Sequence, residues 1–453
     1  MAGIGFELRR LLAPRTYGAI ARACGYAGII ASGPWLSSVL GVSAVGLLGA
    51  RTLPGQQVTA FLVSVTWLMA ASLVFTGPLQ LLLSRFVADR VYEEKPEQIL
   101  PNLFGALCLT TAASGLCGAL LAPLFDGALL RVLLVASFTV LCDLWVVVVL
   151  LSGMKAFRPI LGVFLAGYAL SALAAIPLRA LGTEGLLAAF LLGEAAMLFA
   201  LLALLLRSYP AGRLAAFAFL DRRQAFYGLA LTGLVYNLGI WADKLAFWLD
   251  PRTSAPAMGP LRFSIVYDLP IFFAYLSVVP GAAIFLLRVE TDFAEQHRLF
   301  YALVREGGTL QDIEARKAGM VRAARQGLAD ICKVQGASAL LAWLLAPRVL
   351  PLLHVSTLYL PLLGVDLLAV GLQVLMLSVL TLLFYLDKRA IALGLCLLFA
   401  VSNAALTWLS IRLGPQLYGY GFALSVLITC AAGLPLLARK LDRLEYETFM
   451  LQR

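Results

Sequence analysis

The chain alternates long runs of apolar residues with short polar segments, and one run, 129–152, reads LLRVLLVASFTVLCDLWVVVVLLS. A helix needs about 20 apolar residues to cross a hydrocarbon core of roughly 30 Å. A helix also satisfies its own backbone hydrogen bonds, which lipid requires. The pattern therefore predicts an all-α polytopic membrane protein with about twelve transmembrane helices. The predicted helices are 17–49, 59–84, 101–124, 129–152, 159–178, 184–207, 225–248, 263–288, 328–347, 357–386, 389–411 and 416–438.

Two predicted helices end alike, which indicates an internal duplication. The second ends GPLQLLLSRFVAD and the eighth ends PGAAIFLLRVETD, so that Arg85 aligns with Arg288 and Asp89 with Asp292. Both helices are even-numbered, and we therefore expect parallel repeats, as in transporters built from two bundles around a central cavity. The predicted organisation is a cytoplasmic or interfacial segment 1–16, a six-helix lobe 17–224, a six-helix lobe 225–438 and a cytoplasmic tail 439–453.

One long polar segment interrupts the second lobe. Residues 289–327 form a predicted cytoplasmic helical insertion that Gly307 and Gly308 divide into two pieces. One interpretation is a solvated or interfacial helix pair, and the other is a docking platform for a cytoplasmic partner. The candidate docking residues are Glu295, Arg298, Arg305, Arg316 and Lys317.

The composition excludes a water-soluble globule. Of the 453 residues, 61% are hydrophobic and 13% charged, and the mean hydropathy is +0.91, whereas a soluble domain has about 25% charged residues. With twelve spans and a cytoplasmic N-terminus, 27 of the 35 Lys and Arg residues fall on the cytoplasmic side and 8 on the other. The positive-inside rule thus explains the net charge of +10 without a nucleic-acid partner. It predicts a multi-pass inner-membrane protein with both termini in the cytoplasm.

No enzyme motif stands out in the sequence. It has no P-loop, no H-E-x-x-H and no G-x-S-x-G. Its 7 cysteines form no C-x-x-C pair, and the 2 histidines, His297 and His354, are far apart. The longest outer loop, near 249–262, is too short for a catalytic domain. We expect neither enzymatic activity nor a metal or cofactor.

The helix predicted at 225–248 carries the richest set of intramembrane polar and aromatic residues. Asn237, Trp241, Lys244 and Trp248 recur at steps of four, three and four, which places them on one helix face. Such a face suits sugars, whose C–H faces stack on aromatic rings while their hydroxyls need hydrogen-bonding partners. The alternative is an aromatic belt with a Lys that snorkels to the outer interface.

Other intramembrane polar groups are further candidates for a substrate path, because such groups are costly in lipid. Asp243 is expected to neutralise Lys244 or to form a vestibule with the predicted helix at 263–288. That helix would present Ser264, Asp268 and Tyr275 on one face. The alternative for these charges is a structural ion pair between the two helices. Deeper or inner candidates are Asp143, Glu194, Asp366 with Gln373 along its face, and Arg22.

Two of these carboxylates could couple transport to a proton gradient. Asp143 and Glu194 lie near the middle of their predicted helices, so they are candidates for protonation during transport or, alternatively, for structural neutral acids. Arg22 is a candidate for binding a phosphate or sugar at the cytoplasmic mouth, and the positive-inside rule explains it equally well.

Three stretches, MAGIGFELRRLL (1–12), GYAGIIASGPWLSS (25–38) and YNLGIWADKLAFW (236–248), resemble the PelG family of exopolysaccharide transporters, in the polysaccharide branch of the multidrug/oligosaccharidyl-lipid/polysaccharide (MOP) superfamily. The resemblance implies two six-helix lobes and export of Pel, an N-acetylgalactosamine-rich polymer, across the inner membrane during biofilm formation. It also implies assembly with the cytoplasmic glycosyltransferase PelF and the membrane proteins PelD and PelE.

Other functions stay open from the residues alone. A flippase for a lipid-linked oligosaccharide would need a cationic cavity, for which Arg22 is the candidate. A membrane glycosyltransferase or polymerase is disfavoured by the short outer loops. A drug antiporter is compatible with the predicted fold, because one fold hosts many functions.

Overall fold

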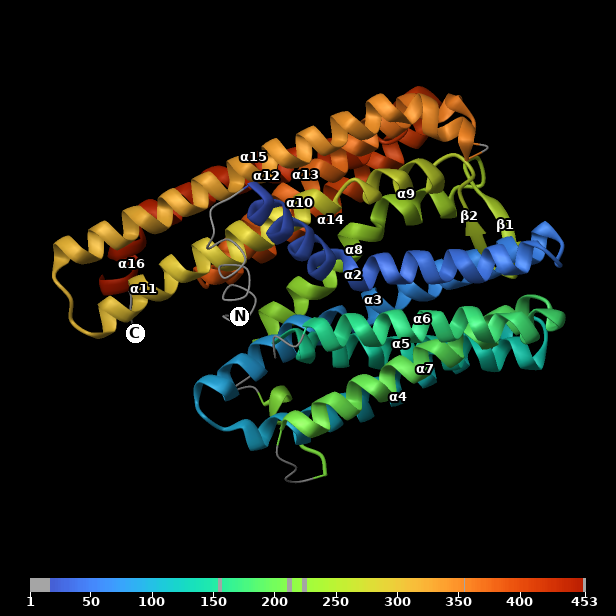
Figure 1. Ribbon diagram of the computed structural model, residues 1–453, viewed down its shortest axis with the longest axis horizontal. Helices are drawn as coiled ribbons and strands as arrows, with labels where there is room; N and C mark the ends of the chain where they lie inside the picture. Colours follow the sequence, from blue (N-terminus) through green and yellow to red (C-terminus); the bar gives the residue numbers. More distant parts are fainter. Residues whose placement is uncertain (1–16, 154–156, 210–213, 222–225, 354, 451–453) are drawn as a thin grey trace. The chain divides into compact units, whose positions relative to one another are not determined.

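The computed structural model describes residues 17–153, 157–209, 214–221, 226–353 and 355–450 (Figure 1). The predictions for residues 1–16 and for the opening motif lie outside these residues. The first half contains α2 (Tyr17–Ala50), α3 (Gly55–Tyr92), α4 (Ile99–Leu121), α5 (Ala128–Gly153), α6 (Phe157–Leu178) and α7 (Thr183–Ser208). The second half contains α8 (Tyr227–Leu249), β1 (Ala255–Met258), β2 (Leu261–Phe263), α9 (Asp268–Leu276), α10 (Val279–Leu287), α11 (Ala294–Arg305), α12 (Leu310–Leu352), α13 (Leu360–Tyr385), α14 (Arg389–Leu413), α15 (Tyr420–Asp442) and α16 (Leu444–Met450).

The helices confirm the predicted fold class. Among the described residues, 10 helices are long and apolar enough to cross a membrane, and the bent pair α9–α10 makes an eleventh candidate. The 23-residue helix α8 is a further long helix, which carries Asp243 and Lys244. The architecture therefore agrees with about twelve helices and with a multi-pass membrane protein.

The predicted single helix at 263–288 is wrong in its details. Phe263 pairs with Ala255 in a β-hairpin, and the helix begins only at Asp268. Ser264 consequently lies outside the helix, where its Oγ donates to the carbonyl of Thr253 at 2.8 Å, so the predicted face with Asp268 and Tyr275 does not include it. The span then bends by 42° between α9 and α10, beside Pro280, which lacks the N–H that a continuous helix would use.

The polar segment 289–327 is helical on both sides of Gly307, and its second helix continues beyond residue 327. A π-helical turn, Arg288–Phe293, leads into α11, and Gly307 with φ +73° makes the turn before α12. Helix α12 then continues for 43 residues from Leu310 into the apolar span. No Pro occurs in it before Pro347, so nothing in the covalent chain interrupts the helix between its polar and apolar halves.

The chain forms two compact units. Of the described residues, unit 1 comprises those within 17–32, 242–247 and 265–450, and unit 2 those within 33–241 and 248–264. Helix α8 contributes to both. The predicted lobe boundary at 224/225 stays a prediction.

Unit 2 has a continuous apolar core in which α5 packs against α3, α4 and α7. Fully buried side chains such as Phe61, Leu141 and Phe190 fill it. Helices α3 and α8 approach backbone to backbone, because a Cβ added to Gly233 would lie 2.1 Å from the carbonyl oxygen of Gly77. Small residues at helix contacts are the usual means of packing spans in lipid.

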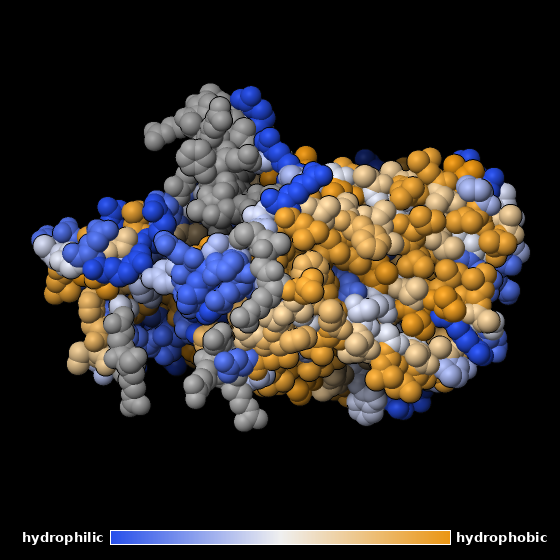
Figure 2. Space-filling view, turned by 90° about the horizontal axis from the view of Figure 1, so that it is seen from below, coloured by the Kyte–Doolittle hydropathy of each residue, from blue (hydrophilic) through white to orange (hydrophobic). Residues whose placement is uncertain are grey.

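Unit 1 combines apolar spans with the polar extension formed by α11 and the first half of α12. Helix α13 packs against α12, α15 and α9. Figure 2 shows hydrophilic side chains gathered toward its left end, the end at which Figure 1 draws α11. The short helix α16 joins this end, where Lys317 of α12 contacts Glu445 at 3.0 Å.

Candidate functional site

A buried ion pair in α8 is the centre of the candidate site in unit 1. Lys244 Nζ lies 3.0 Å from Asp243 Oδ2 and 3.2 Å from Oδ1. Asp243 is 0% exposed and Lys244 7%. Adjacent residues point 100° apart on an ideal helix, so the two side chains reach each other only through the length of the Lys stem. The ammonium is thus held inside the protein by its carboxylate neighbour.

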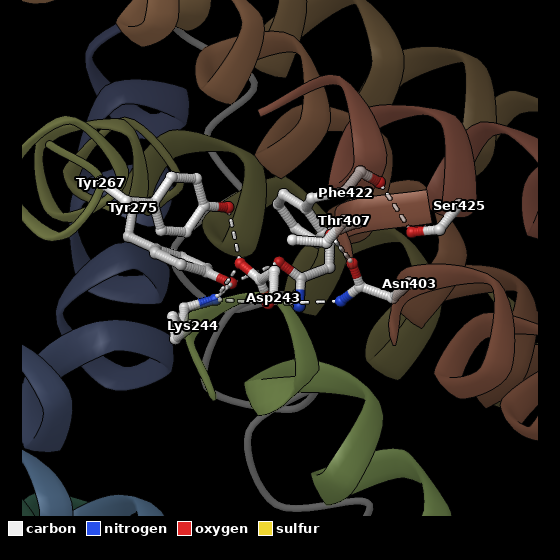
Figure 3. A network of polar contacts seen from close by, with 9 residues as sticks. Asp243, Lys244, Tyr267, Tyr275, Asn403, Thr407, Phe422 and Ser425 are labelled. Atoms are coloured by element: carbon white, nitrogen blue, oxygen red, sulfur yellow. Dashed lines mark hydrogen bonds and ion pairs between the residues drawn. The ribbon is translucent and has the colours of Figure 1, made fainter. Parts of the chain in front are cut away.

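Two further segments contact Asp243. Tyr267, immediately before α9, donates from its hydroxyl to Asp243 Oδ2 at 2.6 Å, and Asn403 Nδ2 of α14 donates to Oδ1 at 3.2 Å. Thr407 Oγ1 in turn donates to Asn403 Oδ1 at 3.1 Å. Figure 3 shows these side chains directed toward the Asp243–Lys244 pair.

Lys244 faces aromatic rings on its other side. Its Nζ lies 3.3 Å from the Tyr275 hydroxyl, which donates to Gln373 Oε1 of α13 at 2.9 Å. The same nitrogen lies 5.0 Å from the Tyr275 ring centroid and 5.2 Å from that of Phe422. A desolvated cation–π contact contributes about 2 kcal/mol. The predicted site residues Lys244 and Tyr275 are therefore brought together, with Gln373 as their link to α13.

Asp366 is the second carboxylate of this region. It lies in α13 and is 0% exposed. Within the described residues neither of its carboxylate oxygens has a hydrogen-bond donor. Asp243 and Lys244 are its charged neighbours. A buried polar group without a partner carries a desolvation penalty of about 1–3 kcal/mol, and more when charged.

The network has a specific chemical capacity. A buried ion pair is seldom a source of net stability, because desolvating two charges offsets their attraction. The pair presents a fixed charge pattern inside the span, where polar groups are candidates for a functional site. The arrangement provides an ammonium, hydroxyls and an amide that can exchange hydrogen bonds with a polar solute.

Unit 2 holds two other predicted carboxylates. Asp143 of α5 is 7% exposed and accepts a hydrogen bond from Thr111 Oγ1 of α4 at 2.7 Å. Glu194 of α7 is 0% exposed and interacts with the buried Tyr168 of α6. Thr111 thus binds Asp143 directly, whereas within the described residues neither carboxylate oxygen of Glu194 has a hydrogen-bond partner.

The remaining residues of the predicted α8 face belong to unit 2. Asn237 Nδ2 donates to the carbonyl of Gly233 at 2.9 Å. The ring of Trp248, 2% exposed, lies 6.0 Å from that of Trp241 and 4.8 Å from that of Trp67 on α3, centroid to centroid.

The other predicted residues lie elsewhere in unit 1. Arg22 is exposed and donates from Nε to the carbonyl of Gly18 at 3.2 Å. Asp268 is half-buried at the first position of α9, one residue beyond the Tyr267 that contacts Asp243.

The predicted docking residues lie on the α11–α12 extension. Arg298 pairs with Glu295 at 2.9 Å, and Arg305 and Arg316 are exposed. Lys317 pairs with Glu445 of α16. A groove of about 620 Å³ lies beside this pair, lined by Glu314, Lys317, Ala318, Val321, Arg322, Arg325, Gln326 and Glu445.

Four residues of the network, Tyr267, Asn403, Thr407 and Phe422, were not predicted from the sequence. Tyr267 and Phe422 look like ordinary apolar-span aromatics, and nothing in their spacing marks them. Asn403 carried a usable signal, because an Asn within a predicted span is a site candidate by default.

The fold of the chain is similar to that of solved transporters. The fold matches the outward-facing conformation of a multidrug resistance MATE family transporter of the MOP superfamily, with a TM-score of 0.65, 14% identity, and coverage of 93% of this chain and 96% of that chain. The inward-facing conformation of such a transporter matches with a TM-score of 0.60, 14% identity, and coverage of 93% and 95%.

A MOP superfamily transporter from Pyrococcus furiosus, described as having a binding pocket of reversed polarity, matches with a TM-score of 0.61, 14% identity, and coverage of 93% and 96%. At this identity the likeness establishes the fold. A search of curated proteins finds no match. The family model for PelG, putative exopolysaccharide exporter (EPS-E), matches residues 1–449, and the chain therefore belongs to the PelG exopolysaccharide exporter family.

Proposed function

We propose that this chain exports the Pel polysaccharide, an N-acetylgalactosamine-rich polymer, from the cytoplasm through the inner membrane, with both termini in the cytoplasm. The observation that carries the proposal is the family match over residues 1–449, and the transporter fold supports it. The role is transport rather than catalysis. The proposed substrate path includes the buried network around Lys244 in unit 1 and, in unit 2, the α8 residues Asn237, Trp241 and Trp248.

The direct test measures where the polymer accumulates when the chain is absent. Cells that lack this chain but retain the synthetic glycosyltransferase should accumulate polymer in the cytoplasm and secrete none. Restoring the chain should restore secretion. If polymer of normal length reached the periplasm without the chain, export would not be its function. Detection of a lipid-linked oligosaccharide intermediate whose orientation depends on the chain would instead favour the flippase alternative.

We further propose that the α11–α12 extension docks the cytoplasmic glycosyltransferase PelF, within an assembly that includes PelD and PelE. The extension is polar and carries exposed arginines, and its groove is lined by charged side chains on α12 and α16. Feeding the polymer directly from synthesis into the transporter would let polymerisation drive its movement. Asp143 and Glu194 are the proposed proton-coupling groups if an ion gradient contributes, because each is a buried acid within a span.

A further inference from the structure

The β1–β2 hairpin joins α8 to α9 and packs against α3 in unit 2. Trp67 of α3 donates from Nε1 to the carbonyl oxygen of Arg262 at 2.8 Å. In the hairpin register, Arg262 pairs with Pro256. These two strand residues therefore lie at the level of Trp67 along α3.

The depth of Trp67 in the membrane can be measured from one end of unit 2. The sequence predicts that this end lies on the outer side. Gln57 of α3 accepts a hydrogen bond through its carbonyl from Thr183 Oγ1 at 3.2 Å. Thr183 lies between Arg179 and Glu184, the charges that bound α6 and α7 at this end. Trp67 is ten residues further along α3, about 15 Å at 1.5 Å per residue. It thus lies well inside a hydrocarbon core of roughly 30 Å, on the outer side of its middle.

The hairpin tip lies at the boundary itself. A Cβ added to Gly259 would be 3.1 Å from the carbonyl oxygen of Leu124, at the end of the α4 segment. A Cβ added to Gly127, three residues after Leu124, would lie 3.4 Å from Glu184 Oε1. From tip to Arg262 is three residues, about 10 Å of strand. The hairpin consequently runs from the boundary inward into the outer half of the span.

A hairpin at this depth conflicts with a lipid environment. Each outer edge of a two-stranded sheet leaves backbone N–H and C=O groups unpaired. Non-helical backbone at membrane depth is tolerated where protein buries it or where it lines a water-filled cavity. Pro256 on β1 is exposed, and so is Arg252 in the turn before it. We propose that the hairpin and this turn line a water-filled recess open to the predicted outer side, and that its tryptophans bind saccharide units of the exported polymer.

The aromatic part of the recess is built around Trp248. Its ring is 2% exposed and is flanked by the half-buried rings of Trp67, tilted by 39°, and Trp241, tilted by 44°. The Trp67 orientation is fixed by its bond to Arg262. An aromatic ring that is only half-buried, as those of Trp67 and Trp241 are, can stack on the C–H face of a pyranose ring.

The polar part of the recess is the guanidinium of Arg262. Its Nε donates to Ser254 Oγ at 2.8 Å and its Nη2 to the Ser254 carbonyl at 3.0 Å. These bonds hold the planar group in place, and its remaining N–H groups can donate to sugar hydroxyls. A few placed polar groups beside aromatic walls are what ligand sites in general contain. The ligand assignment rests on the proposed export function, whereas the aqueous recess does not.

Cysteine labelling tests the recess. In a variant with the seven native cysteines replaced, P256C and T66C are reacted with a membrane-impermeant maleimide in right-side-out vesicles. Thr66 is exposed and adjoins Trp67, so it matches Pro256 in depth. P256C should label at a rate within about tenfold of R131C, an exposed position at the outer end, and T66C should stay unlabelled. If P256C labelled as slowly as T66C, the proposal of a water-filled recess would be wrong. The proposed export function would not be affected by that result.

Calorimetry with a soluble N-acetylgalactosamine oligomer tests the ligand. Trp67→Ala should weaken binding at least tenfold, which is about 1.4 kcal/mol, and Trp67→Phe should retain most of the affinity. Trp408→Ala, at an exposed Trp of α14, is the control and should bind as the wild type does. Unchanged affinity in Trp67→Ala would overturn the saccharide site, even if P256C labels and the wild type exports polymer.

Discussion

Tyr267 fixes the position of Asp243 in two ways. Its hydroxyl donates to Asp243 Oδ2 at 2.6 Å, and its ring stacks on Phe247 of α8 with centroids 4.0 Å apart and planes 6° from parallel. One side chain thus ties the segment before α9 to the α8 turn that carries the ion pair. The charge pattern around Lys244 depends on this tie, because Tyr267 and Asn403 both donate hydrogen bonds to Asp243 from outside α8.

Tyr267→Phe should destabilise the protein while leaving the ring stack in place. A hydrogen bond to a charged group contributes about 1.5–3 kcal/mol, so the unfolding temperature in detergent should fall measurably. Tyr359→Phe removes an exposed hydroxyl that donates to the carbonyl of Ile265 at 3.1 Å, and it should change stability by less than about 0.5 kcal/mol. Equal melting of both variants would refute the special role of the Tyr267 hydroxyl.

The ion pair itself should show strong coupling between its partners. Lys244→Met leaves Asp243 as a buried charge without its cation, and breaking a buried pair in this way costs about 3–5 kcal/mol. The double variant Asp243→Asn/Lys244→Met removes both charges and should recover most of the lost stability. The measurement is a double-mutant cycle of unfolding free energies. Additive losses would contradict a direct pair.

Secretion by the same variants separates stability from transport. If the ammonium takes part in the substrate path, the double variant should fold and reach the membrane at normal levels yet secrete less polymer. Normal secretion by a stable double variant would leave the pair a purely structural feature.

The close approach of α3 and α8 gives a prediction for packing in unit 2. Gly233→Ala places a methyl group 2.1 Å from the Gly77 carbonyl oxygen, so the helices must separate, at a cost of about 1–3 kcal/mol. Gly228 lies in the same helix with nothing within 4 Å of an added Cβ. Gly228→Ala should therefore be neutral or stabilising by up to about 1 kcal/mol, because Ala favours the helix. Thermal unfolding of the two variants side by side provides the comparison.

The helical spans were predictable because lipid admits few alternatives to apolar helices, and segments such as α5 and α13 agree with their predicted ranges within a few residues. The hairpin was not, because Leu261 and Phe263 continue the apolar pattern of the following helix. The spacing of apolar residues along the chain does not show which residues pair between two strands, so the pairing of Leu261 and Phe263 with β1 could not be predicted.

The sequence likewise predicts the charged residues of the candidate site but not the residue that positions them. Charged residues such as Asp243, Lys244 and Asp366 are conspicuous in an apolar span. Their partner Tyr267 is not, because a tyrosine among apolar residues signals only burial.

The proposed docking surface predicts an effect of charge reversal. The triple variant R298E/R305E/R316E changes exposed arginines on α11 and α12, so it should insert normally but lose co-purification with the glycosyltransferase. K95E reverses an exposed charge on another predicted cytoplasmic segment and should retain it. Retained co-purification in the triple variant would place the partner elsewhere.

A paired carboxylate holds α16 at the same end of unit 1. Glu447 forms ion pairs with Lys388, before α14, and with Lys440 of α15. Desolvation acts to raise the pKa of the Glu447 carboxyl, but hydrogen bonds from Lys388 and Lys440 outweigh it, and the pKa lies below its ordinary value of 4.5. A carboxyl with a lowered folded-state pKa stabilises the fold above its unfolded value, and this contribution is lost as the pH falls through the folded-state pKa.

Helix α16 should therefore stay docked at neutral pH and loosen below about pH 4.5, with Leu444 and Thr448 losing their burial. Hydrogen exchange of residues 444–450 reports the change, after correction for the intrinsic pH dependence of exchange. Glu447→Gln should exchange faster at pH 7 and lose the acid-dependent step, because the amide cannot carry the charge that both lysines bind. Glu445→Gln removes the separate pair with Lys317 and should keep that step. An acid step of equal size in Glu447→Gln would assign the docking of α16 to its apolar contacts instead.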